Sequence, residues 1–168
     1  IVNDCSTDNT ERIIKSYQDR RIRYLKTEEN CGSDSKPKNI GIKEARGEYV
    51  AFLDDDDIYR QDALKVLLKY MEHSGADVVY GDYLIEEKGK IKPGWSIDFS
   101  PSLLQKMNYI AMSVAMAKRE CLLEVGGFDE AVPKFKDWNL WLRLQKRGYR
   151  FLHIPIIVTE VYPQEKSI

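Results

Sequence analysis

The sequence predicts an α/β fold, a doubly wound and mostly parallel sheet with helices on both faces, ending in a smaller mixed part. Strand-like and helix-like segments alternate along the first 84 residues, as in chains that build parallel sheets. Residues 49–53 are an uninterrupted apolar run, typical of a strand buried on both faces. With 168 residues, 43% hydrophobic and 32% charged, the chain is long enough for one domain with its own core.

The chain opens on what looks like the end of a strand, at residues 1–2. We therefore expect that the sequence starts partway through its domain and lacks an earlier strand. Asp8 and Glu11 have the spacing of a capping box, which predicts a helix that runs to about Tyr17. A short strand over residues 22–25 is expected next.

Three more elements complete the first half, residues 1–84. Pro37 suits a first helical turn, and Gly47 suits the end of that helix. The strand over residues 49–53 follows. A second helix is predicted by apolar residues at helical spacing and by Gly75 as its end, before a strand over residues 77–83. These apolar residues are Leu64, Leu67, Leu68 and Met71.

The second half, residues 85–168, changes in character. Residues 86–90 look like the tip of a hairpin, and Ser100 followed by Pro101 predicts a capped helix start. The other elements expected are a strand at 111–117, a helix at 137–146 closed by Gly148, and strands at 149–152 and 156–161.

Composition excludes several classes of protein. The formal net charge is −1, so the chain offers no basic footprint for nucleic acid. Its apolar runs are far shorter than the ~20 residues of a transmembrane helix. Three scattered cysteines indicate neither a disulfide framework nor a zinc site. We expect a cytoplasmic protein of a reducing compartment, and its oligomeric state is left open.

Four aspartates, residues 54–57, directly follow the apolar strand. In open α/β sheets, ligands bind at the carboxyl ends of strands. Neighbouring carboxylates repel unless a cation or hydrogen-bond donors relieve them, and hard oxygen ligands suit Mg²⁺ or Mn²⁺ shared with substrate phosphates. A metal and phosphate site is favoured over the alternative, a solvated acidic loop.

A second acidic strand end lies at residues 3–8. Asp8 is expected to cap the first helix. Asp4 precedes the cap, and its carboxylate could accept hydrogen bonds from a base or a sugar, or serve only the turn. Two acidic strand ends in one sheet favour a site more than either does alone.

The third candidate lies at residues 136–144. Asp137 is interpreted either as the N-cap of a helix or as a general base beside two tryptophans. Trp138 and Trp141 are three residues apart, so at least one should belong to the core. Trp95 follows a Pro-Gly pair, and it could stack on a sugar or close the core.

Four segments, taken together and in order, resemble the family-2 glycosyltransferases, nucleotide-sugar enzymes of the Rossmann-like GT-A fold. IVNDCSTDNT (residues 1–10) resembles the family's V-D-D-G-S-T-D segment, and GIKEARGEYVAFLDDDD (41–57) resembles the stretch leading to its DxD motif. VGGFDE (125–130) is very close to the family pattern, and KDWNLWLRLQKRGYR (136–150) resembles its E-D-x-D-L-W-x-R segment. Compared with the family, the opening strand and the helix after it are missing.

The resemblance implies a role for each matching residue. Asp4 would contact the nucleotide base, Asp54 and Asp55 would lie near the ribose and phosphates, and Asp56 would complete the DxD motif as a metal ligand with Asp54. Asp137 would be the base that deprotonates the acceptor hydroxyl, and the sugar would be transferred with inversion. Trp95 and Trp138 are candidate sugar or acceptor contacts. The candidate donor-binding residues are Asp4, Ser6, Lys38, Asp54, Asp55 and Asp56.

Two departures from the family pattern affect the expected chemistry. Lys136 replaces the glutamate before the base, and a neighbouring cation should lower the pKa of Asp137. Residues 162–164 stand where many members carry a histidine that helps hold the metal.

The resemblance favours an inverting, metal-assisted glycosyltransferase with Mn²⁺ or Mg²⁺. Residues 1–84 would bind the donor, with a UDP-sugar favoured, and residues 85–168 would face a saccharide, lipid-linked or protein acceptor. A lipid-linked acceptor would require peripheral attachment at the inner face of the membrane. The alternatives are a truncated or degenerate domain that binds a nucleotide sugar without catalysis and, less favoured, a nucleotidyltransferase.

Overall fold

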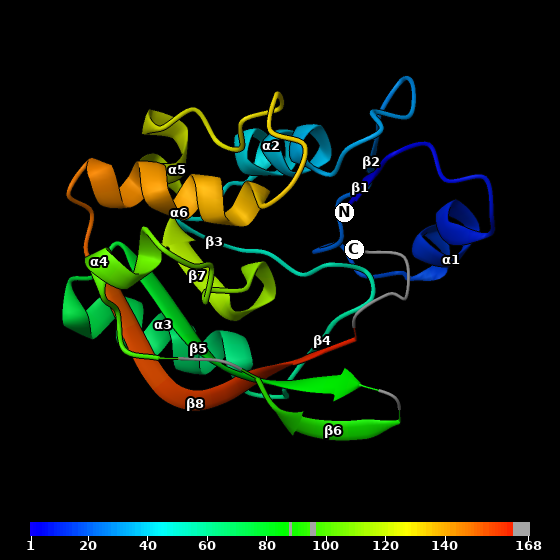
Figure 1. Ribbon diagram of the computed structural model, residues 1–168. Coiled ribbons are helices and arrows are strands. Elements are labelled where there is room, and N and C mark those ends of the chain that lie inside the picture. Colours follow the sequence, from blue (N-terminus) through cyan, green and yellow to red (C-terminus); the bar gives the residue numbers. More distant parts are fainter. Residues whose placement is uncertain (88, 95–96, 163–168) are drawn as a thin grey trace.

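The computed structural model describes residues 1–87, 89–94 and 97–162. Two sheets organise them (Figure 1). The smaller sheet pairs β1 (Val2–Asn3) with β2 (Leu25–Lys26) in parallel. The larger has six strands in the order β3-β7-β5-β8-β4, with β6 on the outer part of β5. Its strands are β3 (Tyr49–Ala51), β4 (Ile58–Tyr59), β5 (Val78–Glu87), β6 (Lys90–Pro93), β7 (Ala115–Lys118) and β8 (Phe151–Val161).

The α/β class is confirmed, but the strand directions differ from the expected mostly parallel order. Among the described strands of the large sheet, only β5 and β8 pair in parallel, whereas β7 is antiparallel to both of its neighbours, β3 and β5. The alternation in the first half would place β3 and β5 side by side. Instead β7, from the second half, lies between them, so the two halves share one mixed sheet.

Helices cover both faces of this sheet (Figure 1). On one face lies α3 (Ala63–Ser74), which ends as predicted at Gly75, where φ is +66°. On the other lie α2 (Ser35–Glu44), α5 (Arg119–Glu124) and α6 (Lys136–Lys146). The remaining helices are α1 (Thr10–Ser16), α4 (Pro101–Leu104) and a short 3₁₀ helix over Met112–Val114.

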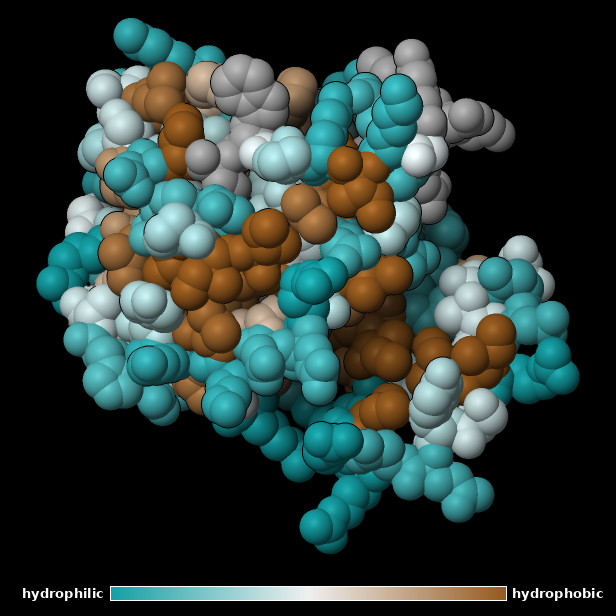
Figure 2. Space-filling view, turned by 90° about the horizontal axis from the view of Figure 1, so that it is seen from below, coloured by the Kyte–Doolittle hydropathy of each residue, from teal (hydrophilic) through white to brown (hydrophobic). Residues whose placement is uncertain are grey.

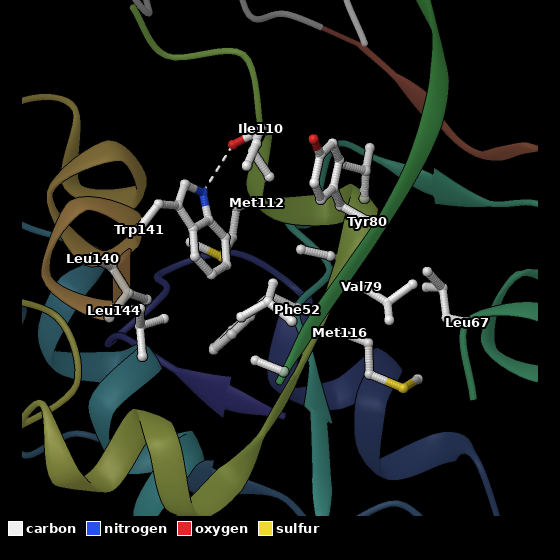
Figure 3. Packing of buried hydrophobic residues seen from close by; sticks show 14 of the residues in the cluster. Phe52, Leu67, Val79, Tyr80, Ile110, Met112, Met116, Leu140, Trp141 and Leu144 are labelled. Carbon is white, nitrogen blue, oxygen red and sulfur yellow. Dashed lines mark hydrogen bonds between the residues drawn. The ribbon is translucent and has the colours of Figure 1, made fainter. Parts of the chain in front are cut away.

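The core fills both faces of the large sheet. Leu140, Trp141 and Leu144 of α6 pack on one side, whereas Leu67 of α3 packs against the other near Val79 (Figure 3). Consecutive residues of the central strand β5 are therefore buried together. This is the pattern of a strand covered on both faces.

The apolar stripe predicted for α3 is only half used. Leu67 and Met71 are buried, whereas Leu64 and Leu68 are 47% and 36% exposed. Other apolar side chains also reach the surface, as the face seen in Figure 2 shows. Within the described residues, no helix has both the length and the apolarity needed to cross a bilayer.

Several local predictions needed correction or refinement. The strand expected at 22–25 is β2, which begins only at Leu25, and the strand expected at 49–53 is β3, which ends at Ala51 and lies at one end of the strand order. The helix expected to end at Gly47 ends at Glu44.

Two further predictions concern a cap and a strand start. The capping box is wrong, because Asp8 accepts hydrogen bonds from Thr10 while Glu11 pairs with Lys15 and Lys26. The strand expected at 111–117 begins with the 3₁₀ helix and becomes β7 only at Ala115.

The two strands expected at 149–152 and 156–161 are one strand, β8. Its register with β5 shifts after Gly81, so that Gly81 pairs with Ile154 and Asp82 with Ile157. Pro155, which has no N–H to donate, lies in this irregularity. A side chain could not replace Gly81, because a Cβ there would lie 2.7 Å from the carbonyl oxygen of Ile156.

Candidate active site

The acidic loop between β3 and β4 divides its four carboxylates into two kinds. Asp54 Oδ1 lies 2.8 Å from Lys38 Nζ, and Asp57 accepts hydrogen bonds from the Ser113 hydroxyl and the Tyr162 amide. By contrast, the carboxylates of Asp55 and Asp56 have no hydrogen-bond partner among the described residues. The outer pair thus anchors the loop, and the inner pair is available to a ligand. Only part of the run therefore fits the solvated-loop interpretation.

Lys38, on α2, connects this loop to a second acidic residue. Its ammonium lies 2.6 Å from Asp34 Oδ2 as well as 2.8 Å from Asp54 Oδ1, and the side chain is only 17% exposed. Burial alone would lower the pKa of Lys38, but the charges of Asp54 and Asp34 raise it. Lys38 is therefore held as a cation beside the acidic loop.

Asp137 lies in the first turn of α6. Phe135 occupies the N-cap position, with φ of +55°, so the alternative that Asp137 caps the helix is wrong. Asp137 Oδ2 accepts a hydrogen bond from Asn108 Nδ2 at 2.8 Å, and Oδ1 accepts one from the Trp138 amide at 2.8 Å. Both carboxylate oxygens are therefore fixed in direction by the protein.

Burial raises the pKa of Asp137 above its ordinary value, and it outweighs the hydrogen bonds from Asn108 and Trp138 and the attraction of Lys38. The expected lowering by Lys136 is therefore wrong. The Lys136 ammonium forms an ion pair with Asp34 Oδ1 at 2.5 Å instead of with Asp137. This raised pKa brings Asp137 nearer to the range in which a carboxylate works as a base at neutral pH.

The two tryptophans of α6 differ in position. Trp141 is completely buried in the core, which confirms the prediction that at least one of the two belongs there. Trp138 is half-buried and donates from its indole to the Leu104 carbonyl at 2.6 Å. Phe135, which sequence reasoning missed, is 64% exposed and meets the Trp138 ring edge to face at 6.0 Å. Trp95, the other candidate contact, lies outside the described residues.

Asp4 belongs to a separate set of contacts. Its carboxylate accepts hydrogen bonds from the Cys31 amide at 3.0 Å and from the Thr27 hydroxyl at 2.8 Å. Partial burial opposes these bonds, but they lower the pKa of Asp4. Ser6 is exposed, and its amide donates to Asn3 Oδ1 at 2.8 Å. Asp4 is thus a fixed anion at the end of β1, tied to the loop that follows β2.

The segment 125–130, read from sequence as a helix end and a turn, joins α2 to α6. Asn39 of α2 exchanges hydrogen bonds with the backbone of Phe128, and Arg143 of α6 donates to the carbonyl oxygens of Val125 and Gly127. Gly127 has φ of +69°, and a Cβ there would lie 2.3 Å from Asn39 Oδ1. Gly127 thus lets this segment fix the helix of Lys38 relative to the helix of Asp137.

A cavity of about 580 Å³ lies over this junction. It is lined by residues of α2, by Leu123 of α5, by the segment 125–130 and by Arg143, and none of the sequence-predicted site residues lines it. Among the predicted residues, Lys38 contacts Asp54 and attracts the carboxylate of Asp137 through its charge.

The carboxylates fit one kind of metal site and not another. The described residues include no group of three or more His, Cys, Asp or Glu side chains arranged to hold a metal ion. Asp56 has no hydrogen-bond partner among the described residues, and Asp54 keeps Oδ2, because Lys38 binds only its Oδ1. The loop can therefore offer two carboxylates, and Mg²⁺ is usually held by one or two carboxylates together with waters and substrate phosphates. This donor set therefore suits a cation shared with a diphosphate.

Comparison with known proteins finds one family. The family model described as Glycosyl transferase family 2 matches residues 1–126. The poly(ribitol-phosphate) beta-N-acetylglucosaminyltransferase TarP of Staphylococcus aureus is 38% identical over 95 residues, which are 55% of this chain and 29% of TarP.

Two solved structures have the same fold. Residues 1–349 of TarS from S. aureus, in complex with UDP-GlcNAc, match 98% of this chain and 49% of that chain, with a TM-score of 0.80 and 20% identity. The mannosyltransferase PcManGT from Pyrobaculum calidifontis, in complex with GDP-Man and Mn²⁺, matches 99% of this chain and 48% of that chain, with a TM-score of 0.72 and 20% identity. The present chain thus spans about half of each structure and 29% of TarP.

Proposed function

Because this chain belongs to glycosyl transferase family 2 and has the GT-A fold, as its four sequence segments predicted, we propose that it performs an inverting, metal-assisted glycosyl transfer. The donor is a nucleoside-diphosphate sugar, and the acceptor supplies a hydroxyl group. The observation that carries the proposal is Asp137, a half-buried carboxylate with a raised pKa, both oxygens fixed, and Lys38 within electrostatic reach. Lys38 in turn binds Asp54 of the DxD segment.

The donor is proposed to lie along the first half of the chain. Asp54 and Asp56 would share a divalent cation with the diphosphate, and Asp55 and Lys38 would lie beside the ribose and phosphates. Asp4 would contact the base, and Ser6 would also contact the donor. A UDP-sugar is favoured because the neighbour with the higher TM-score is a complex with UDP-GlcNAc, although the other is a complex with GDP-Man.

Transfer requires one proton acceptor and one leaving group. Asp137 removes the proton of the acceptor hydroxyl, whose oxygen attacks the anomeric carbon from the face opposite the diphosphate. The bond from that carbon to the diphosphate breaks, and the configuration inverts. A divalent cation, when bound, neutralises charge that develops on the departing diphosphate. Trp138 and the second half of the chain would face the acceptor.

The acceptor is proposed to be a saccharide, a lipid-linked saccharide or a protein, reached from the cytoplasm. For a lipid-linked acceptor the protein would attach peripherally to the membrane. Fractionation of cells, with and without a carbonate wash, tests this placement.

Calorimetric titration with UDP, with and without Mn²⁺, tests the donor site. We expect Mn²⁺-dependent binding that weakens at least about 10-fold in Asp56→Ala, because one of two metal ligands is lost. Glu72→Ala, an exposed acidic residue of α3, is the matched control and should bind as the wild type does. If the folded chain binds none of UDP, GDP and dTDP, the proposal is contradicted. Binding without turnover of any donor would instead identify a non-catalytic nucleotide-sugar-binding domain.

A further inference from the structure

The segment between α4 and the 3₁₀ helix is fastened to the start of α6 at three points. The Leu104 carbonyl accepts from the Trp138 indole at 2.6 Å, and the Ile110 carbonyl accepts from the Trp141 indole at 2.9 Å. Figure 3 shows the second of these bonds, inside the core. Leu104 and Ile110 are themselves completely buried. The chain between them is therefore held at both ends against the helix that carries Asp137.

Asn108 provides the third point. Its Nδ2 donates to Asp137 Oδ2 at 2.8 Å, while its own Oδ1 is buried without a hydrogen-bond partner among the described residues. A buried acceptor without a donor destabilises a fold. The reversed amide would not help, because Oδ1 would then face the carboxylate oxygen of Asp137. The orientation of Asn108 is thus set by the negative charge of Asp137. The Asn108 side chain makes no second hydrogen bond among the described residues that would set this orientation.

We propose that Asn108 is the positioning residue of the base, holding the Asp137 carboxylate ionised and fixed in direction for the acceptor hydroxyl. This inference rests on the proposed function of Asp137. Asn108 does not touch the reacting atoms in this role, since it acts through the carboxylate.

The charges around Asp137 leave this task to few groups. From α2, the Lys38 ammonium attracts the carboxylate, and it also serves Asp54 and Asp34. On α6, Lys136 is bound to Asp34. Burial favours the neutral acid, and the direct hydrogen bond from the Asn108 amide opposes protonation of Asp137.

The test measures the titration of Asp137 directly. The carboxyl carbon of Asp137 is followed by ¹³C NMR from pH 3 to 9 in chain labelled at aspartate, and its signal is assigned with Asp137→Asn. Asn108→Ala should raise the pKa of Asp137 by about one unit, because a hydrogen bond to a charged group is lost. Asn108→Asp, which keeps the size of the side chain, should raise it further and serves where Asn108→Ala does not fold. Gln105→Ala, an exposed residue of the same segment, is the control and should leave the titration unchanged.

A second readout separates positioning from support of the fold. The release of UDP from UDP-GlcNAc is measured against pH, with water as the acceptor. In Asn108→Ala, the acidic limb of the pH profile of kcat/KM should move to higher pH by as much as the pKa of Asp137 rises. At pH values below this limb, kcat/KM should fall about 10-fold. The affinity for UDP should not change.

The outcomes distinguish this inference from the proposed function. If both Asn108 variants titrate Asp137 as the wild type does, the role of Asn108 is overturned. The pKa of Asp137 could shift in the Asn108 variants while the wild type releases no UDP from any donor. In that case the coupling of Asn108 to Asp137 is supported and the proposed function fails. A rate loss in Asn108→Ala without any shift in either pH profile would overturn the positioning role.

Discussion

Asp4 and Asp137, the carboxylates proposed to face the base and the acceptor, are held by opposite means. Around Asp4, residues 1–31 form a two-stranded sheet with two residues in each strand, and α1 has no buried residue. Asp137 lies on α6, whose Leu140, Trp141 and Leu144 are completely buried. Polar contacts between chain segments therefore hold the segment that carries Asp4, whereas the hydrophobic core holds the helix that carries Asp137.

This difference also separates their acid–base behaviour. Hydrogen bonds from Cys31 and Thr27 outweigh partial burial and lower the pKa of Asp4. Burial outweighs the hydrogen bonds of Asp137 and raises its pKa. A carboxylate that stays ionised suits a constant hydrogen-bond acceptor, whereas one with a raised pKa suits a group that takes up a proton. The two regions thus provide the two kinds of carboxylate that the proposed reaction requires.

The largest expected effect is on stability. Trp141→Ala should lower the free energy of unfolding by about 3–5 kcal/mol, because it leaves a cavity in the core and an unpaired Ile110 carbonyl. Ile13→Ala, at a residue of α1 that is 53% exposed, should change it by less than about 0.5 kcal/mol. Urea denaturation measures both. Equal losses would contradict the contrast between the two regions.

Turnover should separate the two carboxylates next. Asp137→Asn should reduce the release of UDP from UDP-GlcNAc by about 10²–10⁴-fold, since the amide cannot accept the proton. Its affinity for UDP should not change. Asp4→Asn should weaken UDP binding instead, with the turnover of saturated protein retained. Calorimetry and a coupled assay for UDP measure these effects, and loss of both properties in one variant would disprove the division of roles.

Lys38 binds Asp54 of the acidic loop and attracts the Asp137 carboxylate, so its removal should affect both donor binding and the base. Lys38→Met should weaken UDP binding about 10-fold, the value of one hydrogen bond to a charged group, and should raise the pKa of Asp137 further. Lys43→Met, at an exposed lysine of the same helix, is the matched control. Titration with UDP and ¹³C NMR of Asp137 measure the two effects. A change in UDP binding without any change in the pKa of Asp137 would show that Lys38 does not couple the acidic loop to Asp137.

The smallest effect is on the pH dependence of stability. The pKa of Asp4 is lowered by folding, so its contribution is present above the unfolded pKa of about 3.9 and is lost as pH falls through the folded value. The pKa of Asp137 is raised, so its contribution is present at low pH and is lost as pH rises through the folded value.

Relative to the wild type, Asp4→Asn should therefore be less stable at pH 7 than at pH 3, and Asp137→Asn should show the reverse. Urea midpoints at the two pH values measure the slopes. Slopes of the same sign would contradict the opposite pKa shifts of these residues.

Local signals in the sequence predicted many of the elements. Gly75 ends α3, and Ser100 caps α4 by accepting a hydrogen bond from the Leu103 amide, as expected. The acidic residues after β3 were expected to form a ligand site. Two of these carboxylates anchor the loop through distant residues: Asp54 binds Lys38 of α2, and Asp57 accepts from Ser113 and Tyr162, which are 56 and 105 residues away from it. No pattern within the loop contains that information.

The sequence by itself determined the α/β class, the family and the residue types at the site, because these depend on apolar periodicity, turn residues and the order of short motifs. The tertiary structure alone decided the place of β7 between β3 and β5, the binding of Lys136 to Asp34, and the contact of Asn108 with Asp137. Each joins segments that lie far apart in the chain, and the charge state of Asp137 follows from what packs around it. Burial and charge act through space. For this reason the sequence neighbour Lys136 predicted the wrong direction for the pKa shift of Asp137.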